Sequence, residues 1–305
     1  MKHLATRTAL ALSLTLGLAA GPLAVAQDAA AVDEAVAATP TALADLLGPA
    51  GVGGIESDFY LWMELPGQGT GVMHWSTAVD DDLIRFTMIN QMNDGEMTST
   101  QYQVFTTEGE FVESGNTMTS SDFHNAQTAV REGEKVRVTN SSSFDGQPGG
   151  PAEASEEVSD YQPVADTIPT AWLPMAFAYH IREGHEQFVV RMTDDVTGRE
   201  MTFVQVFTAE DIGTEVVEIG EAEHEAHVFM LTMTSEVDGQ PADTGEPEMQ
   251  MMQMYVLADG SIVRMSAEYD GVAMSAQAVT AEEAQTLMDA EAEGDAADAV
   301  EDTAE

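Results

Sequence analysis

Hydrophobic and polar residues alternate along much of the chain from about residue 57 onward. The alternation is clearest at residues 84–88, 229–233 and 263–269, and in the first of these Ile84, Phe86 and Met88 flank Arg85 and Thr87. A period of two places every second side chain on the same face of a strand, so one face is buried and the other is solvated. The pattern therefore predicts a chain built mainly from half-buried antiparallel strands.

Turn sequences separate these segments. Asp-Gly pairs supply the positive φ angles that tight hairpins require. The clearest predicted hairpin joins Met251–Leu257 to Ile262–Tyr269 through Asp259-Gly260. Further turn signals occur at residues 93–95, 145–146, 238–239 and 270–271.

Two helices are predicted among the strands. Thr39 and Pro40 have the character of an N-cap and a first helical residue, which predicts a short helix over Pro40–Leu47 that ends at Gly48. The second covers Thr170–Arg182, where apolar residues recur at three- and four-residue steps, Pro174 lies in the first turn and Gly184 is the C-cap.

These elements predict a mainly β fold, in which a strongly curved antiparallel sheet or open barrel packs against one or two helices. A short repeat, Gln-Val-Phe-Thr at residues 103–106 and again at 205–208, suggests the alternative of two similar β half-domains. In architecture, the predicted form resembles the open half-barrels of periplasmic lipid and lipoprotein carriers. The expected segments are a signal peptide (1–26), a flexible Ala-rich acidic stretch with a short helix (27–50), a first β half (51–144), a Gly-, Pro- and acid-rich linker (145–166), a helix with the second β half (167–280), and an acidic helix with a disordered tail (281–305).

The first 26 residues have the pattern of a secretory signal peptide. Lys2 and Arg7 precede an apolar run over residues 9–18, and Ala24-Val25-Ala26 predicts cleavage before Gln27. The chain contains no Cys, so neither a lipidated Cys nor a disulfide is expected. We therefore expect a periplasmic or secreted protein with no transmembrane segment in the mature chain.

Acidic residues dominate the charge, with 54 Asp and Glu against 10 Lys and Arg and a formal net charge of −44. Such a surface repels nucleic acid and anionic lipid, so neither is expected as a partner. Adaptation to a salty medium and a cation-binding surface both fit this balance. The even spread of the acids and the near absence of Lys favour the first.

A metal site is one candidate for chemistry. His224 and His227, with Glu223 and Glu225, supply the imidazoles and carboxylates that a transition metal binds. Residues three apart on a strand point to opposite faces, so a shared metal requires a bulge or a helical turn. Without one, His227 is a core histidine beside Phe229 that makes one hydrogen bond.

A hydrophobic binding site is the other candidate. We expect it between the concave face of the sheet and the second helix, and His180 near the end of that helix is favoured in its charged form by the helix dipole. The 19 Met residues fill irregular apolar space or line a plastic binding surface. The residues predicted to bind a ligand are Trp62, Trp75, Trp172, Phe177, Tyr179 and His180.

No catalytic motif accompanies these candidates. The chain has no Gly-x-Ser-x-Gly elbow and no phosphate-binding glycine loop, and its carboxylates are too numerous to single out a catalytic pair. The leading prediction is therefore an exported, soluble, non-enzymatic binding or carrier protein for a small hydrophobic molecule or an envelope component. The alternatives are a metal-binding protein or metallohydrolase that uses His224 and His227, and a structural envelope protein that binds Ca²⁺ loosely. No cofactor is expected beyond a divalent metal, and the sequence leaves the ligand and the oligomeric state open.

Overall fold

The computed structural model describes residues 36–49, 51, 57–65, 69–92, 97–121, 123–144, 153–194, 196–197, 202–241, 252–269 and 272–288. The predicted signal peptide, the predicted tail beyond residue 288 and the turns at 93–95, 145–146 and 270–271 lie outside these residues.

The described strands form one 16-stranded sheet. In its first arm each strand pairs antiparallel with the next. The strands of this arm are β2 (Ser57–Leu65), β3 (Gly69–Asp80), β4 (Leu83–Met92), β5 (Met97–Thr106), β6 (Phe111–Ser120), β7 (Phe123–Glu132), β8 (Lys135–Phe144) and β9 (Glu153–Asp160).

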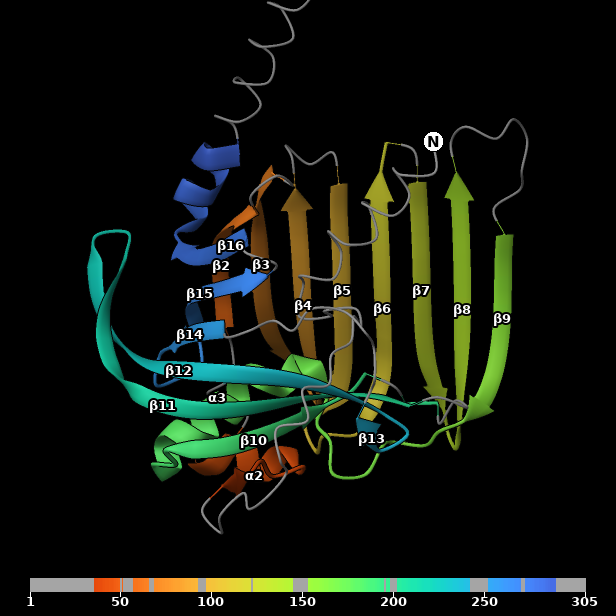
Figure 1. Cartoon of the computed structure of the whole chain (residues 1–305). Coiled ribbons are helices and arrows are strands. Elements are labelled where there is room, and N and C mark those ends of the chain that lie inside the picture. Colours follow the sequence, from red (N-terminus) through yellow and green to blue (C-terminus); the bar gives the residue numbers. More distant parts are fainter. Residues whose placement is uncertain are drawn as a thin grey trace, which may run out of the picture.

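The second arm runs across the direction of the first (Figure 1). Its strands are β10 (Gln187–Met192), β11 (Phe203–Ile219), β12 (Ala222–Val237), β14 (Met252–Val256), β15 (Ile262–Tyr269) and β16 (Val272–Val279). The short β13 (Gln240–Pro241) pairs with β12, and β1 (Ala37–Ala38) pairs parallel to β10.

Backbone pairing between β16 and β2 joins the two arms, with Ala278 opposite Leu61. The sheet is continuous and unclosed, because its order begins at β1 and ends at β9. The prediction of a mainly β fold with one strongly curved sheet is confirmed, and the described strands belong to this one sheet.

The helix α3 (Leu173–Glu183) lies within the curve and packs against the second arm. Its Phe177 packs against Phe188 and Phe229, at ring-centroid distances of 5.4 and 5.0 Å. Just before α3, the 3-10 helix η3 (Thr170–Trp172) brings Trp172 to 5.1 Å from Phe105 of the first arm. As predicted, Pro174 lies in the first turn of α3, and Gly184 ends the helix with a left-handed φ of 71°.

The local patterns that predicted the strands are confirmed. Ile84, Phe86 and Met88 are buried on one face of β4, as are Phe229 and Leu231 on β12. The Asp238-Gly239 turn between β12 and β13 has φ angles of 54° and 71°, which is the conformation that Asp-Gly favours. The hairpin of β14 and β15 also forms, with Gly260 in its turn at a φ of 90°.

The first helix begins later than predicted. The helix α2 (Leu43–Leu47) has Ala42 as its N-cap, so Thr39 does not cap it. The Thr39 hydroxyl instead donates to the carbonyl oxygen of Val189 at 2.8 Å. Because Ala37 and Ala38 pair with β10, the stretch that precedes α2 is held as an edge strand rather than as a helical turn.

The predicted linker over residues 145–166 contains a strand, β9. Its described side chains are mostly exposed, and Glu156 and Asp160 form ion pairs with Arg137 and Lys135 of β8. A strand that is attached through its backbone and through charged pairs has no buried apolar face. It therefore leaves no hydrophobic alternation in the sequence.

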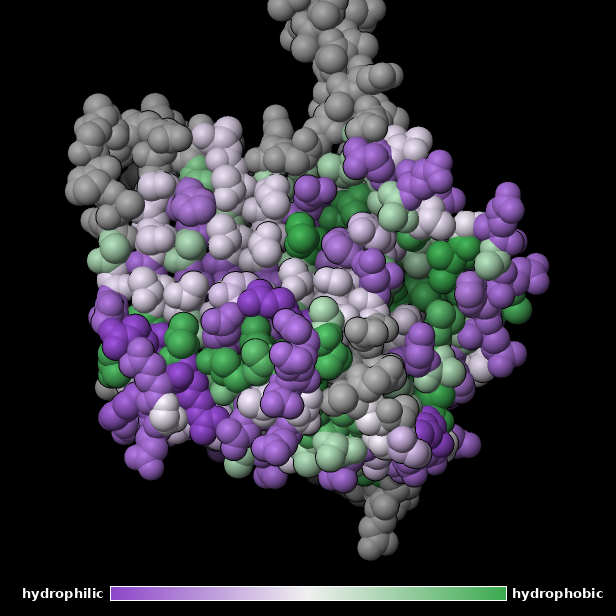
Figure 2. Space-filling view, turned by 180° about the vertical axis from the view of Figure 1, so that it is seen from behind, coloured by the Kyte–Doolittle hydropathy of each residue, from purple (hydrophilic) through white to green (hydrophobic). Residues whose placement is uncertain are grey.

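The outer surface is mostly hydrophilic or intermediate in the view of Figure 2, with hydrophobic side chains gathered in patches. Large hydrophobic side chains that are exposed are few among the described residues: Leu83, Val130, Val158, Ile212 and Val216. A site for a hydrophobic molecule is therefore better sought inside the curve of the sheet.

Candidate functional site

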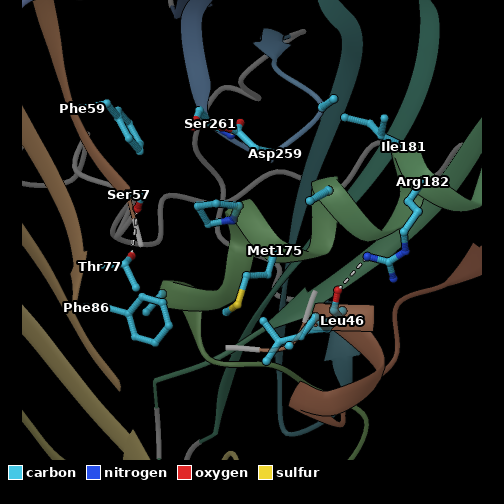
Figure 3. A pocket seen from close by; sticks show the side chains of 16 residues that line it. Leu46, Ser57, Phe59, Thr77, Phe86, Met175, Ile181, Arg182, Asp259 and Ser261 are labelled. Carbon is cyan, nitrogen blue, oxygen red and sulfur yellow. Dashed lines mark hydrogen bonds between the residues drawn. The ribbon is translucent and has the colours of Figure 1, made fainter. Parts of the chain in front are cut away.

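The main cavity lies between α3 and strands β2 to β4, with α2 and the β14–β15 turn at its sides (Figure 3). It has a volume of about 450 Å³. Phe59 of β2 and Phe86 of β4 form its aromatic wall, and Pro174, Met175 and Ala178 of α3 face them. The cavity is therefore the space that remains between α3 and the sheet.

Small side chains on one face of the helix leave this space open. Ala171, Pro174 and Ala178 recur at three- and four-residue steps and all line the cavity. The β14–β15 turn closes one side, because an added Cβ on Gly260 would lie 2.1 Å from the carbonyl oxygen of Pro174. Only glycine permits so close a contact at this φ.

Most polar groups in the wall of the main cavity have partners within the protein. Ser57 donates to the Thr77 hydroxyl at 3.0 Å, and the Asp259 carboxylate accepts from the backbone N–H of Ser261 at 2.9 Å. Arg182 donates to the carbonyl oxygens of Leu46 and Asp45, each at 3.2 Å. With these groups occupied, the wall presents mainly apolar surface to a ligand.

A smaller side cavity of about 30 Å³ lies next to the main cavity and shares two lining residues with it, Phe86 and Ala171. Trp75, Gln103 and Thr170 also line it. The Gln103 amide nitrogen donates to an Asp194 carboxylate oxygen at 2.7 Å, and the same oxygen accepts from the backbone N–H of Thr170 at 3.0 Å. Within the described residues, the buried Trp75 Nε1 and Gln103 Oε1 have no hydrogen-bond partner.

The residues predicted to bind a ligand are placed differently from one another. Trp75 lines the side cavity, whereas Trp172 and Phe177 are packed in the core around α3 and line neither cavity. Trp62 alternates with the buried Leu61 and Met63 on β2, so it lies on the opposite face of that strand from the core. Trp172 and Phe177 thus lie in the core, and the cavity is lined instead by other residues of α3, among them Pro174, Met175 and Ala178.

His180 is buried in the core, with 0% of its surface exposed, and its ring stacks on Phe188 at 3.8 Å. Because the Thr39 hydroxyl donates to Val189, its oxygen accepts from His180 Nε2 at 2.8 Å. His180 Nδ1 then accepts from Nδ1 of His185 at 3.0 Å. These bonds assign a neutral His180 that carries its proton on Nε2.

Burial lowers the pKa of His180 from 6.5 to about 3, with a smaller contribution from His185. The helix dipole therefore does not determine the charge state of His180. The dipole adds up to about 2 kcal/mol in partly buried positions, and the loss of hydration in the core outweighs it. Tyr179, next to His180, lies under the Arg182 guanidinium at 5.4 Å and lines neither cavity.

The predicted metal ligands lie on β12, where the register with β11 is regular from Ala222 to His227. His224 and His227 therefore point to opposite faces, and Glu223 and Glu225 share the face of His227. His227 Nδ1 instead contacts the carboxylate of Asp211 at 2.8 Å. Within the described residues, no three His, Asp or Glu side chains converge as a metal site would require. Metal binding stays a prediction.

The cavity-lining residues of α3 were missed because the sequence prediction weighted aromatic residues. The signal that identifies them is the run of small residues at Ala171, Pro174 and Ala178, spaced three and four residues apart. Of the helices that the structure describes, none has the length and apolar content needed to cross a bilayer.

The fold thus defines a mainly β protein with one large, curved, unclosed sheet around a helix. No family model and no curated protein matches the chain. A "Beta-barrel-like Protein of Domain of Unknown Function DUF1849" from Brucella abortus is similar at 12% identity and a TM-score of 0.40, over 73% of this chain and 94% of that one. The hypothetical lipoprotein YmcC from Escherichia coli K12 is similar at 7% identity and a TM-score of 0.26, over 72% of this chain and 83% of that one. Identities and TM-scores this low assign no function to the chain.

Proposed function

We propose that this protein is a non-enzymatic binding protein that holds one small, largely hydrophobic molecule in the main cavity. The observation that carries the proposal is an inner space of about 450 Å³ with an apolar wall. Sites for small molecules typically measure roughly 300–1,000 Å³ and are lined mainly by hydrophobic and aromatic side chains. Phe59, Phe86 and Met175 supply such a lining here.

The energetics favour a ligand with an alkyl chain. Each buried methylene contributes about 0.8 kcal/mol, so about ten methylenes contribute roughly 8 kcal/mol. Loss of translational and rotational freedom opposes binding by at least about 4 kcal/mol. Contact with the apolar wall alone therefore supports dissociation constants in about the millimolar range, and tighter binding requires a polar contact as well.

The amino-terminal pattern supports the proposal that binding takes place outside the cytoplasm, in the periplasm or after secretion. The acidic balance of 54 Asp and Glu against 10 Lys and Arg also supports an uncharged or weakly polar ligand over a polyanion. An envelope component or a free small molecule both fit this description.

The proposal is tested by fluorescence titration with the uncharged apolar dye N-phenyl-naphthylamine. We expect a saturable rise in dye emission at one dye per chain, and displacement of the dye by tetradecanol. Dye emission that rises only linearly with protein concentration, with no displacement, would contradict the proposal. Circular dichroism on the same samples confirms that the protein is folded.

The metal-binding and Ca²⁺-binding alternatives stay predictions. The His227–Asp211 pair offers two groups, fewer than the three or four protein ligands of most zinc sites. Elemental analysis of protein purified without a His-tag tests the first alternative, and the response of the unfolding midpoint to millimolar Ca²⁺ at matched ionic strength tests the second.

A further inference from the structure

Two residues that line the side cavity each have a buried polar atom without a partner, and the two atoms have opposite hydrogen-bonding roles. The indole Nε1 of Trp75 can only donate, and the amide Oε1 of Gln103 can only accept. The two side chains are 4% and 5% exposed, so bulk water does not satisfy them. Buried polar groups in folded proteins are nearly always paired, and an unpaired group in a cavity therefore points to a missing partner.

The sheet places both side chains on the face that turns toward η3. Trp75 of β3 lies opposite Met88 of β4, and Gln103 of β5 lies opposite Phe86 of the same strand. Adjacent strands are about 4.8 Å apart, and Gln103 is offset by two residues, about 6.7 Å, along the strand direction, so the two Cα atoms are roughly 12 Å apart. Both are long side chains on one face, and both reach the same cavity.

The Gln103 amide is held in one orientation. Its nitrogen donates to Asp194, which also accepts from the backbone of Thr170, so its oxygen is left for a ligand. The Asp194 carboxylate next to this amide also makes the surroundings unfavourable for an anion. The charge of Asp194 and the hydrogen-bonding roles of Trp75 and Gln103 therefore both favour an uncharged group that can donate and accept a hydrogen bond.

We propose that the side cavity holds the polar end of the ligand, and that this end is an uncharged hydroxyl or amide. Such a group accepts a hydrogen bond from Trp75 Nε1 and donates one to Gln103 Oε1. A carboxylate cannot donate to Gln103, and a quaternary ammonium cannot accept from Trp75. The volume of about 30 Å³ has room for a group of this size. The inference rests on the proposed function, because the hydrophobic chain of the same molecule would lie in the main cavity.

The first test compares three amphiphiles with the same chain: tetradecanol, tetradecanoate and tetradecyltrimethylammonium. Each displaces N-phenyl-naphthylamine from the full-length protein, at concentrations below micelle formation. We expect the alcohol to bind at least about tenfold more tightly than either charged compound. Equal affinity for the alcohol and the carboxylate would overturn the inference.

The second test uses Trp75→Phe, which removes the indole N–H and keeps an aromatic ring against Phe59. We expect it to weaken tetradecanol binding about fivefold to tenfold and to reduce the preference for tetradecanol over tetradecyltrimethylammonium by the same factor. Trp172→Phe is the matched control, because Trp172 Nε1 is also buried and unpartnered but lines neither cavity. No change in Trp75→Phe, or an equal loss in both variants, would overturn the inference.

Gln103→Met provides a second variant if Trp75→Phe does not fold, since it removes the acceptor and preserves side-chain length. It is expected to weaken tetradecanol binding and to reduce the preference for tetradecanol over tetradecanoate. The outcomes also separate the two proposals. A protein that binds no dye contradicts the proposed function, whereas dye binding with no preference among the three head groups contradicts only the assignment of the side cavity.

Discussion

Replacing Ala171 with Leu tests whether the inner space is a binding site. Ala171 lines both cavities, so a Leu there occupies the junction between them. The substitution adds three carbon atoms and displaces about three methylenes of ligand, each worth about 0.8 kcal/mol. We therefore expect a loss of roughly 2.4 kcal/mol in binding free energy, or a dissociation constant about 60-fold higher.

The ligand-free protein should respond in the opposite direction. A side chain that fills an empty cavity gains contacts without displacing neighbours, so Ala171→Leu is expected to raise the free energy of unfolding by about 0.5–2 kcal/mol. Ala176→Leu is the matched control, because Ala176 is 0% exposed in the packed core around α3. Overpacking at that position is expected to lower the free energy of unfolding by about 1–3 kcal/mol.

Both quantities are measured on the same preparations. Urea unfolding followed by Trp fluorescence gives the free energy of unfolding, and displacement of N-phenyl-naphthylamine by tetradecanol gives the affinity. If Ala171→Leu binds as tightly as the wild type, the ligand does not occupy this junction. If it is destabilised as much as Ala176→Leu, the space beside Ala171 is not empty. Either result refutes the reasoning.

Three further predictions concern stability. The pKa of His180 is lowered from 6.5 to about 3, so the unfolded chain binds a proton in this range that the folded chain does not. The free energy of unfolding should therefore fall by about 1.4 kcal/mol per pH unit as the pH drops below 6.5. Urea unfolding between pH 7 and 5 should show a shallower fall in His180→Gln than in the wild type. Equal dependence of the unfolding free energy on pH in the two proteins would refute this. Gly260→Ala should cost about 3 kcal/mol or more, because its Cβ meets the backbone of Pro174, whereas Gly133→Ala at a φ of 68° has open space and should cost about 1–2 kcal/mol. Equal costs in urea unfolding would show that the turn does not press on α3. The formal charge of −44 predicts a thermal midpoint that rises between about 0.05 M and 1 M NaCl as repulsion is screened, and a constant midpoint would contradict that expectation.

The strands and the helix at the centre of the fold were predictable because their signals are local. A period of two in residues such as Ile84, Phe86 and Met88 reports one buried face wherever the strand is placed. Proline in the first turn and glycine after the last residue define the two ends of α3 independently of its neighbours.

Features that depend on distant parts of the chain were not predictable in this way. The edge strand β9 is held by its backbone and by charged pairs, so its sequence has the composition of a linker. The burial of His180 depends on Thr39 and Phe188, which are far away in sequence or on another element, and it reverses the charge state that the helix dipole alone would favour. The cavity exists because small residues on α3 leave space opposite Phe59 and Phe86. The periodicity of apolar residues in a sequence gives no information about empty volume between elements.

The most direct measurement is a crystal structure of the protein with tetradecanol that carries bromine at the end of its chain, located by anomalous scattering. The account predicts a bromine peak in the main cavity, in contact with Phe59, Phe86 or Met175, and the hydroxyl directed to Trp75 and Gln103. A bromine peak found only on the outer surface, or crystals that contain the compound in solution and show no peak in the cavity, would contradict it.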